Sequence, residues 1–286
     1  MSGTVNGGHN EVMAEPFTPP SIVVGVDGSR VAVRAALWAL DEAIGRDLPL
    51  HLVAAAEDGD IAGAESLVRA AAAAVQAAGR PVPITTEVVA GAPTPVLLEA
   101  SRNAVMLCVG TIGLKHFDHA RVGSTVTALV ASAHCPVAVV RGGGWPAQAP
   151  PGWVVVELDQ TPDSAAVLQY AVEEARMRRA PLRALGTWQS DDHDAAAHAE
   201  SERAVRVHID RRLEQWRHRY PDLDVLPVAV RGSGLSYLSD HAAAIQLVVV
   251  GARNAAAVGE LLGPPGLAAL SATDCSILVV DRQRLL

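Results

Sequence analysis

Long hydrophobic runs are missing from this chain, although half of its 286 residues are hydrophobic. Its apolar segments are about 4 to 8 residues long, whereas a membrane-spanning helix needs about 20. We therefore expect a soluble protein without a membrane span. The first twenty residues hold neither lysine nor arginine and no apolar stretch, which argues against a signal peptide. Residues 1–20 are predicted to be a disordered leader.

Cysteine and basic residues are also scarce. Cys108, Cys135 and Cys275 form an odd set without CxxC spacing, which argues against a disulfide framework or a zinc site. A reducing, cytoplasmic location is expected. The 31 acidic residues outnumber the 23 basic ones, the net charge is −8, and no basic stripe is interleaved with aromatic residues. Nucleic acid is therefore not an expected partner.

What the sequence does contain is an internal repeat. Residues 22–27 read IVVGVD and residues 154–159 read VVVELD, and the same offset of 132 positions relates 38–43 to 170–175. A register kept over more than twenty residues indicates duplication. Later matches shift the offset to 141, so nine residues were added in the second copy, within a polar helical stretch around residues 191–220.

The length accommodates two domains of ordinary size. The first is predicted at 21–141 and the second at 153–286. Between them, residues 142–152 are rich in glycine and proline, which cannot sustain a helix or a central strand. This stretch is the predicted linker.

Each copy has the pattern of an α/β domain. Runs of Val, Ile and Leu alternate with helical patterns in the first copy, at 22–26, 50–55, 84–89, 105–109 and 136–140. Continuous apolar strands indicate a parallel sheet covered on both faces. The predicted fold is therefore two tandem doubly wound parallel five-stranded sheets with helices on both faces, Rossmann-like. The first helix is expected to bury one apolar stripe, made of Val33, Leu37, Leu40 and Ile44.

A glycine-rich loop follows the fourth strand, where ligands of such folds bind. Its candidate binding residues lie at the strand's end and at the start of the next helix: Gly110, Thr111, Gly113, Gly123, Ser124 and Thr125. Glycines let the backbone approach a phosphate, and a helix amino terminus adds partial positive charge. From loop chemistry alone the alternative stays open that Gly110 ends a strand and Ser124 caps a helix.

Other side chains of this loop are less informative. Lys115 is the single lysine of the chain and a candidate phosphate ligand, although a solvated loop lysine is an equally open interpretation. His116 and His119 have three-residue spacing in a loop without a further ligand pattern, which argues against a metal site.

The spacing Gly-x2-Gly-x9-Gly-Ser at 110–124, with Val-Gly-Val-Asp-Gly-Ser at 24–29, resembles the ATP-binding branch of the universal stress protein family. The resemblance covers nearly the whole chain, twice, and implies the adenine nucleotide alpha hydrolase-like fold. It implies that ATP is the ligand, with the presence of Mg²⁺ left open. It further implies that Asp27, beside Gly25, faces the ribose and adenine. The backbone near Ala55 would read the adenine edge, and the glycine-rich loop would hold the phosphates.

The second copy departs from this pattern. Asn254 stands where the second glycine should be, Pro264 and Pro265 replace the Ser-Thr pair, and Gln160 follows Asp159 in place of a glycine. Proline has neither an amide hydrogen nor a hydroxyl to offer. We expect this copy to be structural or to hold at most a nucleoside, unless it binds ATP in another geometry.

The resemblance also implies an assembly. Fifth strands of this family pair edge to edge, so residues 137–140 and 277–280 should pair within the chain as a pseudo-dimer. An open apolar sheet edge would otherwise invite aggregation. Whole chains are expected to dimerise further.

The function expected from these features is that of a cytoplasmic, ATP-binding stress-response regulator with an unidentified protein partner. No catalytic constellation accompanies the loop, so a binding module is favoured over an enzyme. The runner-up is a slow ATP hydrolase of the adenine nucleotide hydrolase class, whose Ser-Gly-Gly-x-Asp-Ser loop is replaced here by Gly25–Ser29. Binding of cyclic AMP, or a role as a nucleotide-free interaction protein, also stays open.

Overall fold

The computed structural model describes residues 20–111, 122–142, 151–159, 161, 163–189, 195–270 and 273–281. The first copy consists of β1 (Ser21–Gly25), α1 (Arg30–Arg46), β2 (Leu50–Ala56), α2 (Ile61–Ala77), β3 (Ile84–Ala90), α3 (Pro93–Ala100), β4 (Ala104–Gly110), α4 (Ser124–Ser132) and β5 (Val137–Val140). The second copy consists of β6 (Trp153–Glu157), α5 (Ser164–Met177), β7 (Leu182–Trp188), α6 (Ala195–Arg219), β8 (Val225–Arg231), α7 (Gly234–Asp240), β9 (Ile245–Gly251), α8 (Ala255–Leu262), α9 (Pro264–Ala269) and β10 (Ser276–Val280).

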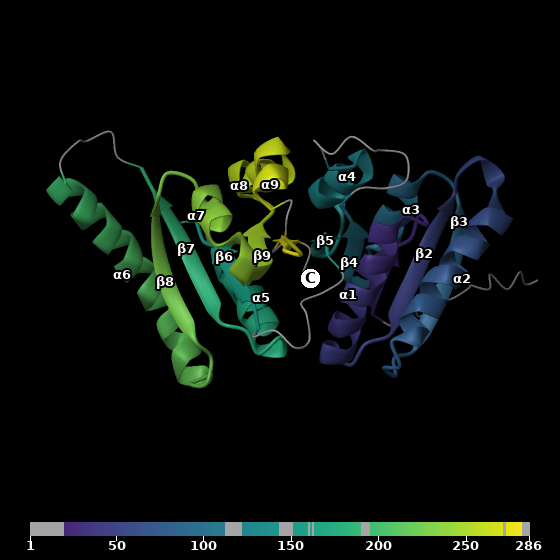
Figure 1. Ribbon diagram of the computed structural model, residues 1–286, viewed down its shortest axis with the longest axis horizontal. Helices are drawn as coiled ribbons and strands as arrows, with labels where there is room; N and C mark the ends of the chain where they lie inside the picture. The colour runs from purple at the N-terminus through teal and green to yellow at the C-terminus, as the bar shows by residue number, and fades with distance from the viewer. Residues whose placement is uncertain are drawn as a thin grey trace, which may run out of the picture.

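The strands form one continuous sheet in the order β3-β2-β1-β4-β5-β10-β9-β6-β7-β8. Pairing is parallel within each copy and antiparallel where β5 meets β10, with Ile277 opposite Val139 and Val279 opposite Val137. The predicted α/β class and the predicted pairing of the fifth strands are both confirmed. Because that pairing joins the two five-stranded sheets, the chain has one ten-stranded sheet (Figure 1).

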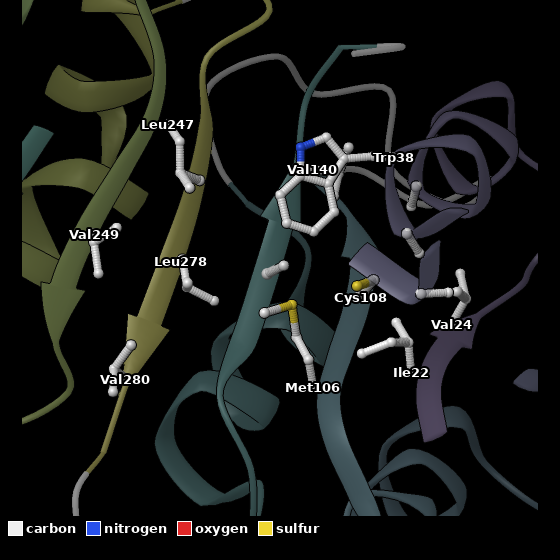
Figure 2. Close-up of a cluster of buried hydrophobic side chains, with 14 of the residues drawn as sticks. Ile22, Val24, Trp38, Met106, Cys108, Val140, Leu247, Val249, Leu278 and Val280 are labelled. Carbon is white, nitrogen blue, oxygen red and sulfur yellow. The ribbon is translucent and has the colours of Figure 1, made fainter. Parts of the chain in front are cut away.

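Helices cover both faces of this sheet. Helices α1, α2, α5 and α6 pack on one face, and α3, α4, α7, α8 and α9 pack on the other (Figure 1). Each face has its own buried core, and each core continues from one copy into the other. Figure 2 shows this continuity on the α1 face, where Met106 and Val140 of the first copy are followed by Leu278 and Val249 of the second.

Helix α1 buries a different surface from the predicted stripe. Its buried positions are mostly small residues, among them Ala32, Ala35, Ala36, Ala39 and Ala43, whereas Ile44 is 36% exposed. Of the predicted stripe, only Leu40 is buried. Small side chains let the helix lie close to the sheet, and close packing of the interior decides which face is buried. Val33, Leu37 and Ile44 are therefore left at the rim of the buried face, while Trp38 and Leu40 are buried.

The nine added residues lengthen one helix of the second copy, as predicted. Helix α6 has 25 residues, whereas its counterpart α2 has 17. Only Ile209 and Leu213 of α6 are buried, so most of this helix is a polar surface. No helix in the described ranges combines the length and hydropathy that crossing a bilayer requires.

Two buried glutamates and two partly buried arginines form an ionic cluster where α1 and α5 meet. Arg46 pairs with Glu42 at 3.2 Å and with Glu174 at 2.5 Å. Arg178 pairs with Glu42 at 2.5 Å and also with Glu174. Both glutamate side chains are 0% exposed. The two Glu–Arg pairs occupy equivalent positions in the repeat, so this ionic cluster joins the copies symmetrically.

Glu174 is expected to make the stability of this interface depend on pH. Burial and the neighbouring Glu42 carboxylate raise the pKa of Glu174 from 4.5 to about 7. Because the folded state holds this proton more tightly than the unfolded state, the stabilisation is fully present below pH 4.5. It is lost as the pH rises toward 7 and the folded-state carboxyl ionises. In urea unfolding between about pH 5 and about pH 8, the wild type should lose stability relative to Glu174→Gln. Parallel curves for the two proteins would show that this carboxyl does not titrate in the range.

Candidate functional site

The carboxyl ends of β1 and β4 lie where the strand order of the first copy reverses. Strand β1 pairs with β2 on one side and with β4 on the other. The chain leaves β1 into α1 on one face and leaves β4 toward α4 on the opposite face. Such a reversal opens a crevice beyond the strand ends, which is the usual ligand position in this class of fold. The sequence-predicted residues Gly25 and Gly110 end these two strands.

Both of these glycines lie in close contact with a neighbouring helix. A Cβ atom added to Gly110 would lie 2.9 Å from the carbonyl carbon of Val31 in α1, and one added to Gly25 would lie 2.8 Å from Cδ1 of Leu97 in α3. Backbone atoms cannot give way as a flexible side chain can. Gly110 therefore has a structural role in seating α1 on β4, in addition to any role toward a ligand.

Asp27 lies in the turn between β1 and α1. Its Oδ1 accepts a hydrogen bond from the Ser29 amide at 2.9 Å, and Ser29 Oγ in turn accepts one from the Ala32 amide at 3.1 Å as the N-cap of α1. Gly28 between them has φ +80°, a conformation that favours glycine. The turn holds the partly buried Asp27 carboxylate at the carboxyl end of β1, beside the crevice.

The backbone amide and carbonyl of Ala55 are directed toward β1, beyond the end of that strand. Val53 O accepts from the Val26 amide on the β1 side, and Ala56 O accepts from the Gly91 amide on the β3 side. Because backbone groups of a strand alternate in direction, the amide and carbonyl of Ala55 point to the β1 side. The β1–β2 register ends at Gly25 and Val53, so Ala55 lies two residues beyond it. A donor and an acceptor from one residue thus face the crevice.

Helix α4 begins next to the end of β4. The Thr111 amide donates to the Val140 carbonyl at 3.1 Å, and the Gly123 amide donates to the Thr111 carbonyl at 3.2 Å. Gly123 is the N-cap, and Ser124 and Thr125 form the first turn, Ser124 exposed and Thr125 partly so. First-turn amides have no partner inside their own helix. The candidates Gly113 and Lys115, like His116 and His119, lie outside the described residues.

The corresponding place in the second copy is filled by protein. Asn254, the counterpart of Gly113, caps α8 by accepting from the Ala257 amide at 3.2 Å. Helix α8 then runs directly into α9, and the Gly259 carbonyl accepts from the Gly263 amide at 2.9 Å. Pro264 and Pro265, which follow, have no amide hydrogen. The start of α9 therefore has few donors left for an anion.

The second copy also has carboxylates at this edge. Glu157 occupies the position of Gly25 and lies against Gly234 at the start of α7. Burial and the nearby Glu260 raise the pKa of Glu157. The hollow beside Glu157 and Asp159 has a volume of about 10 Å³, which is room for about one water molecule. Neither the space nor the charge suits a nucleotide phosphate.

Asp159 is engaged in its own turn through Oδ1. Its Oδ1 accepts hydrogen bonds from the Thr161 amide at 2.9 Å, from Thr161 Oγ1 at 2.6 Å and from Ser164 Oγ. Burial alone would raise the pKa of Asp159, but these hydrogen bonds outweigh it and lower the pKa. The Asp159 carbonyl accepts from Arg212 Nη1 at 3.0 Å. This aspartate therefore supports the start of α5.

Sequence reasoning did not predict the closure of the second site by Glu157 and α8. The signal for Glu157 was present, because the repeat aligns it with Gly25. The signal for α8 was the run of alanine and leucine after Asn254, an ordinary helix start.

Comparison with known proteins shows the family. The model of the universal stress protein family matches residues 20–141 and 153–281. Universal stress protein Rv2028c of Mycobacterium tuberculosis is 42% identical over 285 residues, covering 96% of this chain and 100% of the relative. Universal stress protein Rv2624c of the same organism is 40% identical over 274 residues, covering 93% and 97%. The fold is shared with a universal stress protein from Archaeoglobus fulgidus, at a TM-score of 0.63 and 15% identity over 92% of this chain and 96% of that one. The chain therefore belongs to the universal stress protein family and carries two tandem copies of its domain.

Proposed function

We propose that the first copy binds ATP and that the protein is a nucleotide-dependent regulator of the stress response in the cytoplasm. The observation that carries this proposal is the contrast between the two copies. In the first, the start of α4 adjoins the end of β4 with its first turn accessible, whereas in the second α8, two prolines and Glu157 occupy the same place. A helix start that is exposed in one copy, at Ser124, and covered by protein in the other supports a binding role for the first copy.

Each part of the nucleotide has a matching group in this crevice. The amide and carbonyl of Ala55 suit the adenine edge, and the Asp27 carboxylate suits a ribose hydroxyl. The first-turn amides of α4, with the hydroxyls of Ser124 and Thr125, suit the phosphates. No described group of three or more His, Cys, Asp or Glu could hold a metal. Any Mg²⁺ would therefore arrive with the phosphates, assisted by these hydroxyls.

Helix α4 offers a route from this site to the rest of the molecule. It begins at the crevice and ends at Ser132, just before β5, the strand that pairs with the second copy. A ligand held at its start is linked through the helix to the junction of the copies. We propose that nucleotide binding at α4 controls further dimerisation of whole chains or the binding of a protein partner.

The test is to identify the small molecule that accompanies the protein through purification. Mass spectrometry of the denatured protein should detect ATP or ADP near one per chain. If cyclic AMP is the only nucleotide detected, it replaces ATP as the ligand of the site. Absence of any nucleotide, together with no binding of added ATP in calorimetry, would leave a nucleotide-free interaction protein.

Replacing Gly123 by alanine should weaken ATP binding without weakening the fold. A Cβ at this position would meet nothing of the described protein closer than the Thr111 carbonyl oxygen at 4.0 Å, and φ is an ordinary −58°. The added methyl would instead occupy the space above the helix start, where a phosphate must approach. We expect at least a tenfold loss of affinity in calorimetry, the loss of about one hydrogen bond to a charged group.

Gly110→Ala is the matched comparison. Its Cβ would meet the Val31 backbone at 2.9 to 3.0 Å, so thermal unfolding should detect a destabilisation of about 1–3 kcal/mol. Unchanged ATP affinity in Gly123→Ala would show that this glycine does not face the phosphates.

A further inference from the structure

Arg141, the residue directly after β5, has a guanidinium that is largely buried. Its Nε and Nη2 atoms are buried and have no hydrogen-bond partner among the residues that the structure describes. A buried charge is costly unless it is paired and hydrogen-bonded. Burial lowers the pKa of Arg141, yet a guanidinium stays charged in proteins. Two buried donors of this side chain therefore lack an acceptor among the described residues, and a bound anion would supply one.

The groups nearest to Arg141 do not provide that anion. Arg141 and Cys275 lie just outside the paired parts of β5 and β10, where the continued register sets them opposite each other, and burial raises the pKa of the Cys275 thiol to about 12. The thiol is therefore neutral at physiological pH. The neighbouring carboxylate of Asp274 lies against Gly142.

Arg141 lies beside the start of the glycine-rich loop. The Thr111 amide donates to the carbonyl of Val140, the preceding residue, and the Thr111 carbonyl accepts from Gly123. Val137 and Val139 of β5 belong to the core on the α4 face, so by alternation Arg141 is on that face as well. Neighbouring strands are about 5 Å apart, a distance that an extended arginine side chain spans easily. A phosphate at the start of α4 is therefore within its reach.

The second copy has the opposite charge at this position. The Ala252 amide donates to the Val280 carbonyl at 2.8 Å, which repeats the Thr111–Val140 contact, and the residue that follows is Asp281. The cation thus occurs in the copy with the exposed α4 start, and the anion occurs in the copy whose equivalent place is filled by α8. This distribution is expected if the residue after the fifth strand contacts the ligand.

We propose that Arg141 is a phosphate-binding residue of the first copy's site and that it selects nucleoside polyphosphates over monophosphates. The proposal rests on the nucleotide site proposed above. A guanidinium binds phosphate oxygens with two parallel hydrogen bonds. The adenosine part is held at β1 and β2, at least two strands away from β5, so the side chain contacts only a phosphate chain that extends to the α4 end of the crevice.

The experiment is calorimetric titration of the full-length protein and its Arg141→Met variant with ATP, AMP, cyclic AMP and inorganic tripolyphosphate. Methionine keeps the apolar stem and removes the charge. ATP affinity should fall about tenfold to a hundredfold, the value of one hydrogen bond or bidentate pair to a charged group. Affinities for AMP and cyclic AMP should change by less than about twofold on the same scale. Arg102→Met, at an exposed arginine paired with Glu99, is the control and should leave all four affinities unchanged.

The outcomes separate this proposal from the nucleotide site itself. Unchanged ATP affinity in Arg141→Met, or an equal loss for all the nucleotides, would overturn it. If the wild type binds tripolyphosphate in an Arg141-dependent way but not ATP, the anion site stands and the ATP site is wrong. If it binds neither, both are wrong. Thermal unfolding without nucleotide should show the variant at least as stable as the wild type, because an unpaired buried charge has been removed.

Discussion

ATP is expected to saturate this chain at one nucleotide per molecule. In the first copy the start of α4 offers amides and two hydroxyls, whereas in the second the Gly263 amide is already bonded to Gly259 and two prolines follow. Hydrogen bonds to charged groups contribute about 1.5 to 3 kcal/mol each, so losing two or three lowers affinity by several orders of magnitude. Isothermal titration should therefore give a stoichiometry close to one.

The same titration should assign the site to the first copy. Asp27→Ala should abolish binding, because it removes the carboxylate beside the crevice. Asp159→Ala is a matched control, since each aspartate accepts a backbone amide in the turn before a helix and each variant loses that contact. Two equivalent sites, or binding that is lost only through Asp159→Ala, would show that the functional copy has been wrongly assigned.

Removing one arginine from the ionic cluster should cause a large loss of stability. In Arg178→Met, two fully buried carboxylates would share the single guanidinium of Arg46. Leaving a buried charge uncompensated typically costs about 3 to 5 kcal/mol. Methionine retains most of the packing beside Trp38, whose ring lies 5.0 Å from the Arg178 guanidinium carbon. The free energy of unfolding in urea should report the loss of charge rather than a cavity.

Two further variants test that interpretation. Arg69→Met breaks the exposed pair with Glu65 and should change stability by no more than about 1 kcal/mol. Adding Glu174→Gln to Arg178→Met removes one of the two carboxylates and should restore part of the lost stability. If Arg178→Met is no more destabilising than Arg69→Met, the cluster does not hold the copies together.

The sequence was sufficient to predict the sheet because its signals are local and repeated. Continuous apolar runs marked every strand of the first copy, and the offset between the copies identified the longer α6. The buried face of α1 was predicted wrongly, because alanines give little hydropathy signal although they pack most closely. Tertiary contact, which a periodic pattern does not contain, decides which side of such a helix faces the sheet.

The candidate site could be inferred from the sequence only in part, for a similar reason. Glycines and hydroxyls at fixed spacing are visible in the sequence, and they gave Gly110, Gly123, Ser124 and Thr125. Arg141, which we propose as a phosphate ligand, was not predicted, because it follows an apolar strand about 16 residues beyond the loop motif and adjoins the loop only through β4–β5 pairing. The ionic cluster pairs side chains 128 and 136 positions apart, and the antiparallel junction of the two copies brings them together.

The antiparallel junction of β5 and β10 lies within one chain, so natural selection can act on each half of the paired unit separately. When two separate identical chains pair through their fifth strands, the pair depends on concentration, and every substitution appears in both halves. Covalent linkage replaces the concentration dependence with a fixed effective concentration. It also allows each half to diverge alone, so Glu157, Asn254 and the two prolines could accumulate on one side while the other kept its glycines. A tandem chain can thus keep one half as a permanent partner for the other, released from any need to bind the ligand itself.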